Sequence, residues 1–285
     1  MDAIFTKEEV KKCLFNMNGS KAPGPDGMPA RFFQHYWDTV GDTLCSMVLN
    51  FLNNGAFLKK FNFTLITLIP KVDRPLNMTQ FKPIAICNMV TKVIAKFLVD
   101  RLKRLFPLVI LETQSALVLQ RLITNNILLA YEARHVIKRK KTRKEGYMSI
   151  KLDMLKAYDR VEWSFLREML IQLGLSAKWV QTIMVYVESV TYSLLINGEH
   201  VGYVKPGRGL RQGDPLSPYL FIVCTEGLIS LLNGACTNGD LQGIKLGSNL
   251  NPLTHLMFSD DTLLLGKATV GEARTIKSIL STYEM

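Results

Sequence analysis

The chain has 285 residues, 48% of them apolar and 9% aromatic, which is enough to bury the core of one large or two ordinary domains and excludes a disordered protein. Its formal net charge of +11 favours an anionic partner, with nucleic acid the first candidate and an acidic membrane surface the second. The five cysteines are odd in number and widely spaced, and the four histidines are scattered, which excludes a disulfide framework and leaves no basis for a zinc site.

The start of the chain lacks a basic segment followed by an apolar core, so we expect no signal peptide. The longest apolar run, Tyr219 to Leu232, contains Glu226 and is too short to span a bilayer. We therefore expect a soluble, intracellular protein of the nucleus or the cytoplasm, with no membrane among its partners. The sequence leaves the oligomeric state open.

The first half of the chain predicts four helices and one strand. Thr6 and Glu9 form a capping box, which predicts a helix to about Met17. The turn Lys21-Ala22-Pro23-Gly24-Pro25-Asp26-Gly27 forbids regular structure. The remaining elements are expected at residues 30–53 (helix, ending near Gly55), 63–70 (strand), 88–106 (helix, after a polar loop that reaches Phe81 and Pro83) and 122–138 (helix).

Strands and helices alternate in the second half. Asn197-Gly198 is a strong signal for a two-residue hairpin between strands at 191–196 and 200–205. Ser217, followed by Pro218, predicts the start of a helix that runs to about Asn233. The other expected elements are a strand at 147–153, helices at 162–174 and 177–189, a glycine-rich loop at 207–214, a hairpin around residues 260 and 261, and a helix from about residue 270.

Three aspartates follow or join apolar strands. Asp260 and Asp261 lie side by side at the fold-back of an apolar strand pair, with no basic residue beside them, and Asp153 ends the strand that begins at Tyr147. Two carboxylates about 4 Å apart repel each other by ~1 kcal/mol in water and ~4 kcal/mol near a protein surface. Hard divalent cations relieve this repulsion, and nucleotidyl transfer commonly uses two of them. The acids therefore predict a two-metal site.

A basic stretch lies between the two halves. Seven basic residues fall within eleven positions that contain no acid: Arg134, Lys138, Arg139, Lys140, Lys141, Arg143 and Lys144. Such a stretch is either a solvated loop or a contact to a nucleic-acid backbone.

The ordered motifs resemble the reverse transcriptase domain of LINE-type, non-LTR retrotransposons, most closely the kind abundant in plants. The matching segments cover almost the whole chain. They are Lys21-Ala22-Pro23-Gly24-Pro25-Asp26-Gly27, Leu68-Ile69-Pro70-Lys71, Phe81-Lys82-Pro83-Ile84, Lys151-Leu152-Asp153, Arg160-Val161-Glu162-Trp163, Gly209-Leu210-Arg211-Gln212-Gly213-Asp214-Pro215-Leu216-Ser217-Pro218 and Phe258-Ser259-Asp260-Asp261.

The resemblance implies a role for each motif. Asp153, Asp260 and Asp261 would hold two Mg²⁺, with Mn²⁺ as a substitute, while a primer 3′-hydroxyl attacks a deoxynucleoside triphosphate opposite an RNA template. Lys71 and Lys82 would contact the triphosphate. Further implied nucleotide contacts are Tyr158 as a steric gate against the ribose 2′-hydroxyl, Gln212 and Gly213 beside the nascent base pair, and Arg211 steadying the same loop or a phosphate.

Some positions depart from the family pattern. Lys82 stands where arginine is usual, and Ser259 where alanine is common. The resemblance also implies that the family continues into a thumb, so a chain without one should grip template and DNA primer weakly.

The sequence thus predicts an α/β (α+β) fold with right-hand polymerase fingers and palm, and no thumb. Residues 1–150 would form an N-terminal extension and fingers-like region, and 151–285 an antiparallel palm sheet that carries the acids. Two alternatives stay open: an RNA-directed RNA polymerase, against which Tyr158 argues, and a catalytically decayed RNA-binding remnant.

Overall fold

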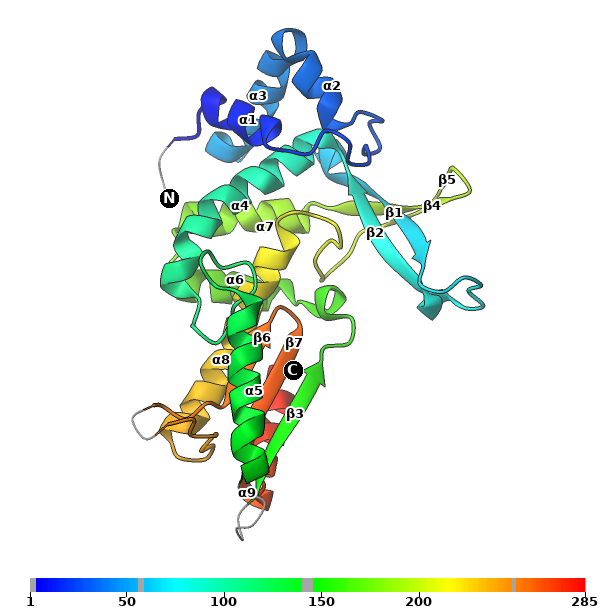
Figure 1. The fold of residues 1–285 in the computed structure, drawn as a ribbon. Helices are drawn as coiled ribbons and strands as arrows, with labels where there is room; N and C mark the ends of the chain where they lie inside the picture. Colours follow the sequence, from blue (N-terminus) through cyan, green and yellow to red (C-terminus); the bar gives the residue numbers. More distant parts are fainter. Residues whose placement is uncertain (1–3, 56–58, 140–145, 248–249, 285) are drawn as a thin grey trace. The chain divides into compact units, whose positions relative to one another are not determined.

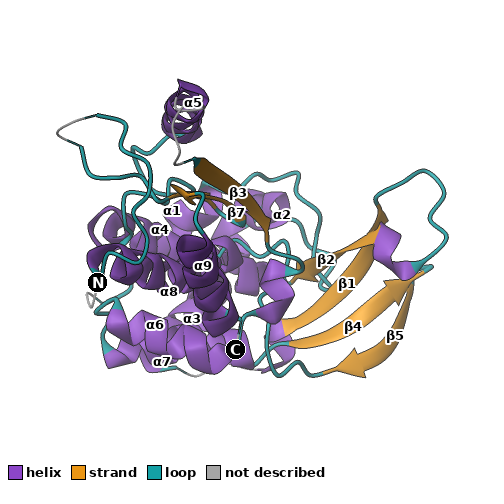
Figure 2. Ribbon diagram, turned by 90° about the horizontal axis from the view of Figure 1, so that it is seen from below, coloured by secondary structure: helices purple, strands orange, loops and turns teal. Residues whose placement is uncertain are grey.

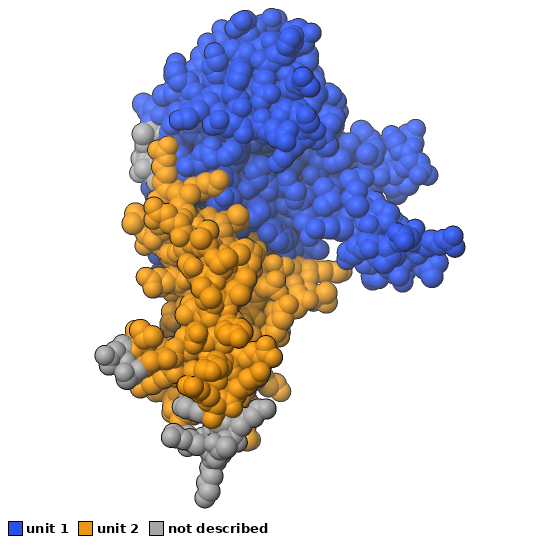
Figure 3. Space-filling view, viewed as in Figure 1, with its two compact units in different colours: residues 1–102, 158–220 blue, residues 103–157, 221–285 orange. Residues whose placement is uncertain are grey.

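The computed structural model describes residues 4–55, 59–139, 146–247 and 250–284. It divides into two compact units, each built from two separate stretches of chain (Figure 3). Unit 1 comprises Met1–Leu102 and Tyr158–Leu220, and unit 2 comprises Lys103–Ala157 and Phe221–Met285. The sequence predicted two continuous regions with a boundary at residue 150, whereas each unit of the structure combines two separate stretches. The assignment of fingers and palm to the predicted regions stays a prediction.

Unit 1 joins helices to a four-stranded sheet of order β2-β1-β4-β5 (Figure 2). Strand β1 runs antiparallel to β2 and parallel to β4, and β4 and β5 form the predicted hairpin. Its elements are α1 (Lys7–Phe15), α2 (Ala30–His35), α3 (Trp37–Asn54), η1 (Lys59–Asn62), β1 (Phe63–Pro70), η2 (Met78–Gln80), β2 (Phe81–Cys87), most of α4 (Met89–Val109) and of η3 (Ala157–Arg160), α6 (Trp163–Gln172), α7 (Ala177–Glu188), β4 (Thr191–Ile196), β5 (Glu199–Val204) and the start of α8 (Ser217–Thr237).

Local sequence signals fix several of these boundaries. The Thr6 side chain accepts the Glu9 N–H and the Glu9 carboxylate accepts the Thr6 N–H, which confirms the capping box. Asn197 and Gly198 both have positive φ (50° and 87°), as a type I′ hairpin turn requires. Both predictions are confirmed.

Two expectations about unit 1 are corrected. The long helix expected at 30–53 is interrupted at Tyr36, where φ and ψ are −97° and 29°. Bulky aromatic residues such as Phe32 and Tyr36 lose side-chain freedom in a helix, and their rings pack 5.1 Å apart beside the break. The second correction concerns β2. The sequence predicted a polar loop as far as Phe81 and Pro83, because lysine and proline are uncommon inside strands, but these residues belong to an edge strand.

The Pro- and Gly-rich turn at 21–27 packs against the junction of β2 and α4. The Asp26 carboxylate accepts the Met89 N–H at 2.8 Å, at the first residue of α4, and the Asp26 N–H donates to Asn88 Oδ1 at 3.0 Å. A side chain on Gly24 would collide with the Cys87 carbonyl. The turn therefore caps α4, and position 24 has no room for a side chain beside the Cys87 carbonyl.

Unit 2 is a three-stranded antiparallel sheet of order β3-β7-β6 with helices on both faces (Figure 1). Ala133 of α5 packs with Leu265 on one face, and Leu228 of α8 and Ile276 of α9 pack with Leu264 on the other. Its elements are α5 (Ile123–Arg139), β3 (Tyr147–Asp153), the rest of α8, β6 (His255–Phe258), β7 (Asp261–Lys267) and α9 (Val270–Tyr283). The predicted mixed α/β fold with an antiparallel sheet is confirmed.

Helix α8 is the one helix in the described part of the chain that is long and apolar enough to cross a membrane, judged by length and composition. Its apolar segment is 56% buried within the molecule, and Leu228, Ile229 and Leu232 are fully buried in the core of unit 2. Since a core helix passes the same test, this is weak evidence for a membrane segment.

Candidate active site

The three predicted acids meet at one end of the β3-β7-β6 sheet. Asp153, the last residue of β3, is the register partner of Asp261, the first residue of β7, and Asp260 directly precedes Asp261 in the turn. Directly opposed residues of an antiparallel pair have Cα atoms about 4.5–5.5 Å apart. Asp153 and Asp261 are exposed and Asp260 is partly exposed, so solvent ions can reach all three.

The turn that presents Asp260 is held in an unusual conformation. Phe258 pairs with Asp261, so Ser259 and Asp260 alone form the turn between β6 and β7. Ser259, the first of these two residues, has φ of +59°, a value that glycine adopts far more readily than a residue with a side chain. For a residue with a side chain, positive φ costs about 1–2 kcal/mol of conformational free energy. Contacts with neighbouring groups must therefore stabilise Ser259 in this conformation.

In the folded chain a lysine lies beside the acids, although none stands next to Asp260 and Asp261 in the sequence. Lys151 Nζ lies 3.1 Å from Asp261 Oδ1, and this contact raises the pKa of Lys151 above its ordinary value. Lys151 precedes Asp153 by two residues on β3, so both side chains leave the same face of the sheet. Both members of the pair are exposed, and solvent screens such a pair, so the acids keep most of their attraction for cations.

The donor set fits a hard divalent cation. Over the described ranges, no three His, Cys, Asp or Glu side chains converge as a ready-made metal cage. Mg²⁺ seldom needs one, because proteins usually bind it through one or two carboxylates together with water and substrate phosphates. The exposed carboxylates of Asp153 and Asp261, with Asp260 beside them, supply such ligands. That they bind metal stays a prediction.

In unit 1, the glycine-rich loop at 207–214 is joined to β2. The Ala85 N–H donates to the Gln212 carbonyl at 2.7 Å. Gly213 has φ of +102°, and a side chain there would lie 3.1 Å from the Ala85 carbonyl. Glycine is therefore required for the approach of this loop to the strand that carries Lys82.

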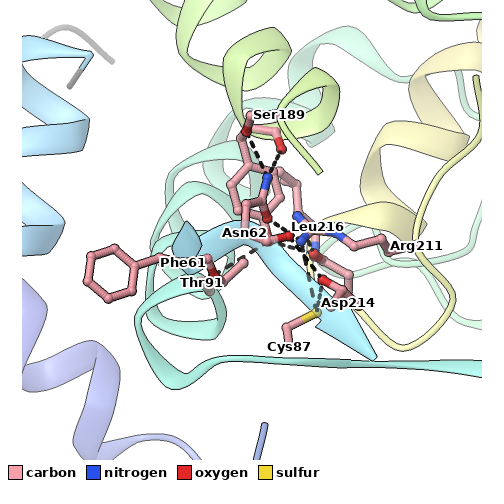
Figure 4. A network of polar contacts seen from close by, with 10 residues as sticks. Phe61, Asn62, Cys87, Thr91, Ser189, Arg211, Asp214 and Leu216 are labelled. Carbon is pink, nitrogen blue, oxygen red and sulfur yellow. Dashed lines mark hydrogen bonds and ion pairs between the residues drawn. The ribbon is translucent and has the colours of Figure 1, made fainter. Parts of the chain in front are cut away.

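Arg211 is buried within unit 1, and its guanidinium contacts other protein groups (Figure 4). It donates to Asn62 Oδ1, forms an ion pair with Asp214 (Nη2 to Oδ2, 3.0 Å) and stacks 4.4 Å from the centre of the Tyr186 ring. Burial acts to lower the pKa of Arg211, but the surrounding groups, Asp214 among them, raise it above its ordinary value, so the charge is kept. Of the two roles that the sequence left open, these contacts support the one in which Arg211 steadies the loop.

The network extends from the loop into the neighbouring helices. Burial raises the pKa of Tyr186 well above its ordinary value, so its hydroxyl stays protonated and donates to Asp214. Asp214 Oδ1 also accepts the Leu216 N–H at 2.7 Å, just before α8. The Asn62 amide donates to the Ser189 hydroxyl at 2.8 Å. The loop is thus attached to α7, to α8 and to the start of β1.

A pocket of about 150 Å³ lies beside this loop, within unit 1. It is lined by Ile66, Pro83, Ala85, Asp159, Tyr192 and residues 208–212. The Gln212 Oε1 atom is buried and has no hydrogen-bond partner among the described residues. An acceptor left in this state favours a ligand that donates a hydrogen bond.

The remaining predicted contacts lie at several places. Lys71 and Lys82 are exposed near the tip of the β1–β2 hairpin, and Tyr158 is half-buried in η3, where its carbonyl accepts the Leu210 N–H at 2.8 Å. Of the basic stretch, three residues, Arg134, Lys138 and Arg139, are exposed along α5. The other four, Lys140, Lys141, Arg143 and Lys144, lie outside the described residues.

Comparison with known proteins gives one family match. The family described as "Reverse transcriptase (RNA-dependent DNA polymerase)" matches residues 69–284, a range that contains all three acids, both lysines and the 207–214 loop.

The individual relatives belong to mobile elements or are uncharacterized. The chain is 26% identical, over 95% of its length, to the Transposon TX1 uncharacterized 149 kDa protein of Xenopus laevis, of which it covers 20%. It is also 26% identical, over 95% of its length, to the Retrovirus-related Pol polyprotein from type-1 retrotransposable element R2 of Nasonia vitripennis, of which it covers 24%. An uncharacterized mitochondrial protein of Arabidopsis thaliana is 56% identical over 24% of this chain. The chain therefore spans a fifth to a quarter of the length of the TX1 and Nasonia proteins.

Proposed function

Because the chain belongs to the reverse transcriptase (RNA-dependent DNA polymerase) family, as its ordered motifs predicted, we propose that it carries out RNA-directed DNA synthesis for a non-LTR retrotransposon. The observation that carries the proposal is the β3–β7 register, in which Asp153 is opposite Asp261, the residue that follows Asp260. The three acids lie together at an exposed end of the sheet, and their mutual repulsion favours a cationic ligand.

Reverse transcriptase domains in general depend on divalent metal ions. In this chain Asp153, Asp260 and Asp261 would hold two Mg²⁺, or Mn²⁺ in their place, which would activate the primer 3′-hydroxyl and stabilise the leaving pyrophosphate. The carboxylates would fix both ions at the end of the sheet.

Four residues are proposed to contact the incoming deoxynucleotide. Lys71 and Lys82 would contact its triphosphate as single positive charges, since lysine lacks the two-pronged donor geometry of arginine. The 150 Å³ pocket is smaller than the 300–1,000 Å³ typical of small-molecule sites, so it would take only one part of the nucleotide. Gln212 Oε1 would accept a hydrogen bond there, and Gly213 would line the nascent base pair.

Sugar selection would depend on Tyr158. A ring at this position would block a ribose 2′-hydroxyl, so a smaller side chain should admit ribonucleotides. RNA template and DNA primer would be held partly by Arg134, Lys138 and Arg139 on α5 and by the basic residues that follow, through contacts that weaken as salt rises.

The test is primer extension by the purified chain on a primed RNA template with Mg²⁺ and deoxynucleotides. Wild-type chain should extend the primer and Asp260→Asn should not, because one metal ligand is lost. Asp240→Asn, which alters an exposed aspartate elsewhere in unit 2, is the matched control and should extend like wild type. Equal extension by Asp260→Asn would contradict the assignment of the metal site.

The same assay separates the alternatives. Preferred incorporation of ribonucleotides would identify an RNA-directed RNA polymerase and would contradict the role given to Tyr158. Tight RNA binding without incorporation in either Mg²⁺ or Mn²⁺ would identify a decayed RNA-binding remnant.

A further inference from the structure

A loop that precedes α5 runs beside β6 and extends the sheet of unit 2. Gln114 forms a parallel bridge with Met257, in which the Met257 N–H donates to the Thr113 carbonyl at 2.9 Å and the Ser115 N–H donates to the Met257 carbonyl at 3.2 Å. The loop thus lies along the strand that leads into the Ser259–Asp260 turn.

The side chain of Gln114 continues from this bridge to the turn itself. It is completely buried. Its Oε1 accepts the Ser259 N–H at 3.2 Å and the Ala116 N–H at 3.0 Å, while its Nε2 donates to Thr225 Oγ1 of α8 at 3.4 Å. One neutral side chain therefore ties the loop, α8 and the turn together.

The contact falls on the strained residue. Ser259 has φ of +59°, and it directly precedes Asp260. A non-glycine residue stays in this region only when neighbouring groups hold it there. Because Oε1 accepts the Ser259 N–H, Gln114 helps to fix the conformation of Ser259, the residue directly before Asp260.

The loop is itself fixed, so it can act as a rigid support. The Arg121 guanidinium donates to the carbonyls of Ile110, Leu111 and Gln114 at 2.7, 2.6 and 2.8 Å. Asn126 Nδ2 donates to the Met257 carbonyl at 2.9 Å, which joins the start of α5 to the same strand.

We propose that Gln114 is a positioning residue that holds the Ser259–Asp260 turn in the conformation in which the acids bind divalent metal. This rests on the function proposed above. The alternative is that Gln114 only fills the core, in which case its loss would lower stability without altering the turn specifically.

The first test uses two readouts, hydrogen exchange of the Ser259 amide by NMR and Mn²⁺ binding by electron paramagnetic resonance. Gln114→Met has similar size but no amide, so all three hydrogen bonds of the side chain are lost, the one from the Ser259 N–H among them. Ser259 exchange should become about tenfold faster and Mn²⁺ binding about tenfold weaker, because the Ser259 N–H loses its acceptor. Thr225→Val removes the partner of Nε2 but leaves Oε1 in place, so both readouts should stay close to wild type. Unchanged exchange and Mn²⁺ binding in Gln114→Met would overturn the proposal.

The second test is rescue. Glycine adopts φ of +59° without steric strain, so Ser259→Gly should restore most of the Mn²⁺ binding that Gln114→Met loses. A double variant that binds Mn²⁺ no better than Gln114→Met would contradict a role through the turn. If Gln114→Met does not fold, Gln114→Asn, which keeps the amide but is one methylene shorter, serves the same comparison.

Amide exchange does not depend on catalysis, so two failures are distinguishable. Wild-type chain that binds no Mn²⁺ and extends no primer would end the proposed function, whatever the exchange rates are. Wild-type activity with normal Ser259 exchange in Gln114→Met would end only the role given to Gln114.

Discussion

Two turns of the molecule differ in whether their charged side chains are buried or exposed. In the 207–214 loop of unit 1, Arg211 and Asp214 are only 5% and 2% exposed, and each contacts several groups of the protein. In the turn of unit 2, Asp261 and its partner Asp153 are exposed, and Asp261 has one exposed lysine beside it. Buried, paired charges are engaged by groups of the protein itself, whereas exposed like charges remain accessible to a ligand from solvent. The comparison thus separates charges that support the structure from charges available for chemistry.

The energetics of the two turns should differ accordingly. Removing one partner of a buried ion pair leaves an uncompensated charge and costs about 3–5 kcal/mol of stability. Removing one of several exposed acids relieves repulsion and should leave stability unchanged or slightly higher. The predictions below test this contrast.

The largest effect should be on activity, through Asp153→Asn. Loss of a metal ligand should lower the rate of single-turnover primer extension by at least about a thousandfold, because charge stabilisation at the reacting phosphate is lost. The midpoint of urea unfolding should not fall. A variant that unfolds more easily, in proportion to its lost activity, would show that Asp153 supports the fold.

Arg211→Met should produce the largest loss of stability. We expect a decrease of about 3–5 kcal/mol in the free energy of unfolding, because Asp214 is left buried without its partner. Arg208→Met is the matched control in the same loop, since Arg208 is exposed and pairs at 3.0 Å with the exposed Glu162. Its loss should cost less than about 1 kcal/mol. Equal losses in urea titrations of the two variants would contradict the contrast between buried and exposed charge.

Glu226 is a buried acid that should give unit 2 a specific dependence on pH. It is 5% exposed, one carboxylate oxygen accepts the Leu111 N–H, and burial raises its pKa from 4.5 to about 7. The folded state therefore binds more protons than the unfolded state between about pH 4.5 and pH 7. The stability that the protonated Glu226 side chain provides is present below about pH 4.5 and is lost as pH rises to about 7. Glu226→Gln should be more stable than wild type by about 2–3 kcal/mol at pH 8 and nearly equal at pH 4.

His255 acts in the opposite direction and must be included when these curves are fitted. Burial lowers its pKa from 6.5 to about 4, so its contribution is lost as pH falls from about 6.5 to 4. The difference between wild type and Glu226→Gln cancels this contribution. A difference that does not grow between pH 5 and pH 8 would contradict the raised pKa of Glu226.

The smallest effect should come from Lys151. Lys151→Met removes the exposed cation beside Asp261, so Mn²⁺ should bind about two- to fivefold more tightly at low salt, and the gain should shrink as salt rises. Lys151→Arg keeps the charge and should bind Mn²⁺ like wild type. Weaker Mn²⁺ binding by Lys151→Met would indicate that the lysine assists the site.

Local patterns predicted most of the elements but not every boundary. The strands 63–70, 147–153 and 191–196 begin and end where expected, because β-branched and apolar runs end at turn-forming residues. Strand β2 was missed because Pro83 argues against a central strand, whereas here it lies on an edge. The break at Tyr36 depends on how aromatic rings pack, which periodicity does not report.

The site was predictable only in part. The apolar strands beside Asp153 and Asp261 indicated that the acids lie at strand ends, and in the register the last residue of β3, Asp153, is opposite the first residue of β7, Asp261. The contacts of Gln114 with Ser259 and of Arg211 with Asn62 join residues 145 and 149 positions apart, so no local pattern could reveal them. Lys151 could have been found, because a residue two positions before Asp153 on a strand shares its face.

The most direct test of the central claim is Mn²⁺ binding by the wild-type chain and by Asp153→Asn, followed by electron paramagnetic resonance in the presence of a deoxynucleoside triphosphate and a primed RNA template. If the exposed acids form a two-metal site, wild type should bind two Mn²⁺ in this complex, and Asp153→Asn should bind fewer or bind them much more weakly. Equal numbers of ions and equal affinities in the two proteins would contradict it.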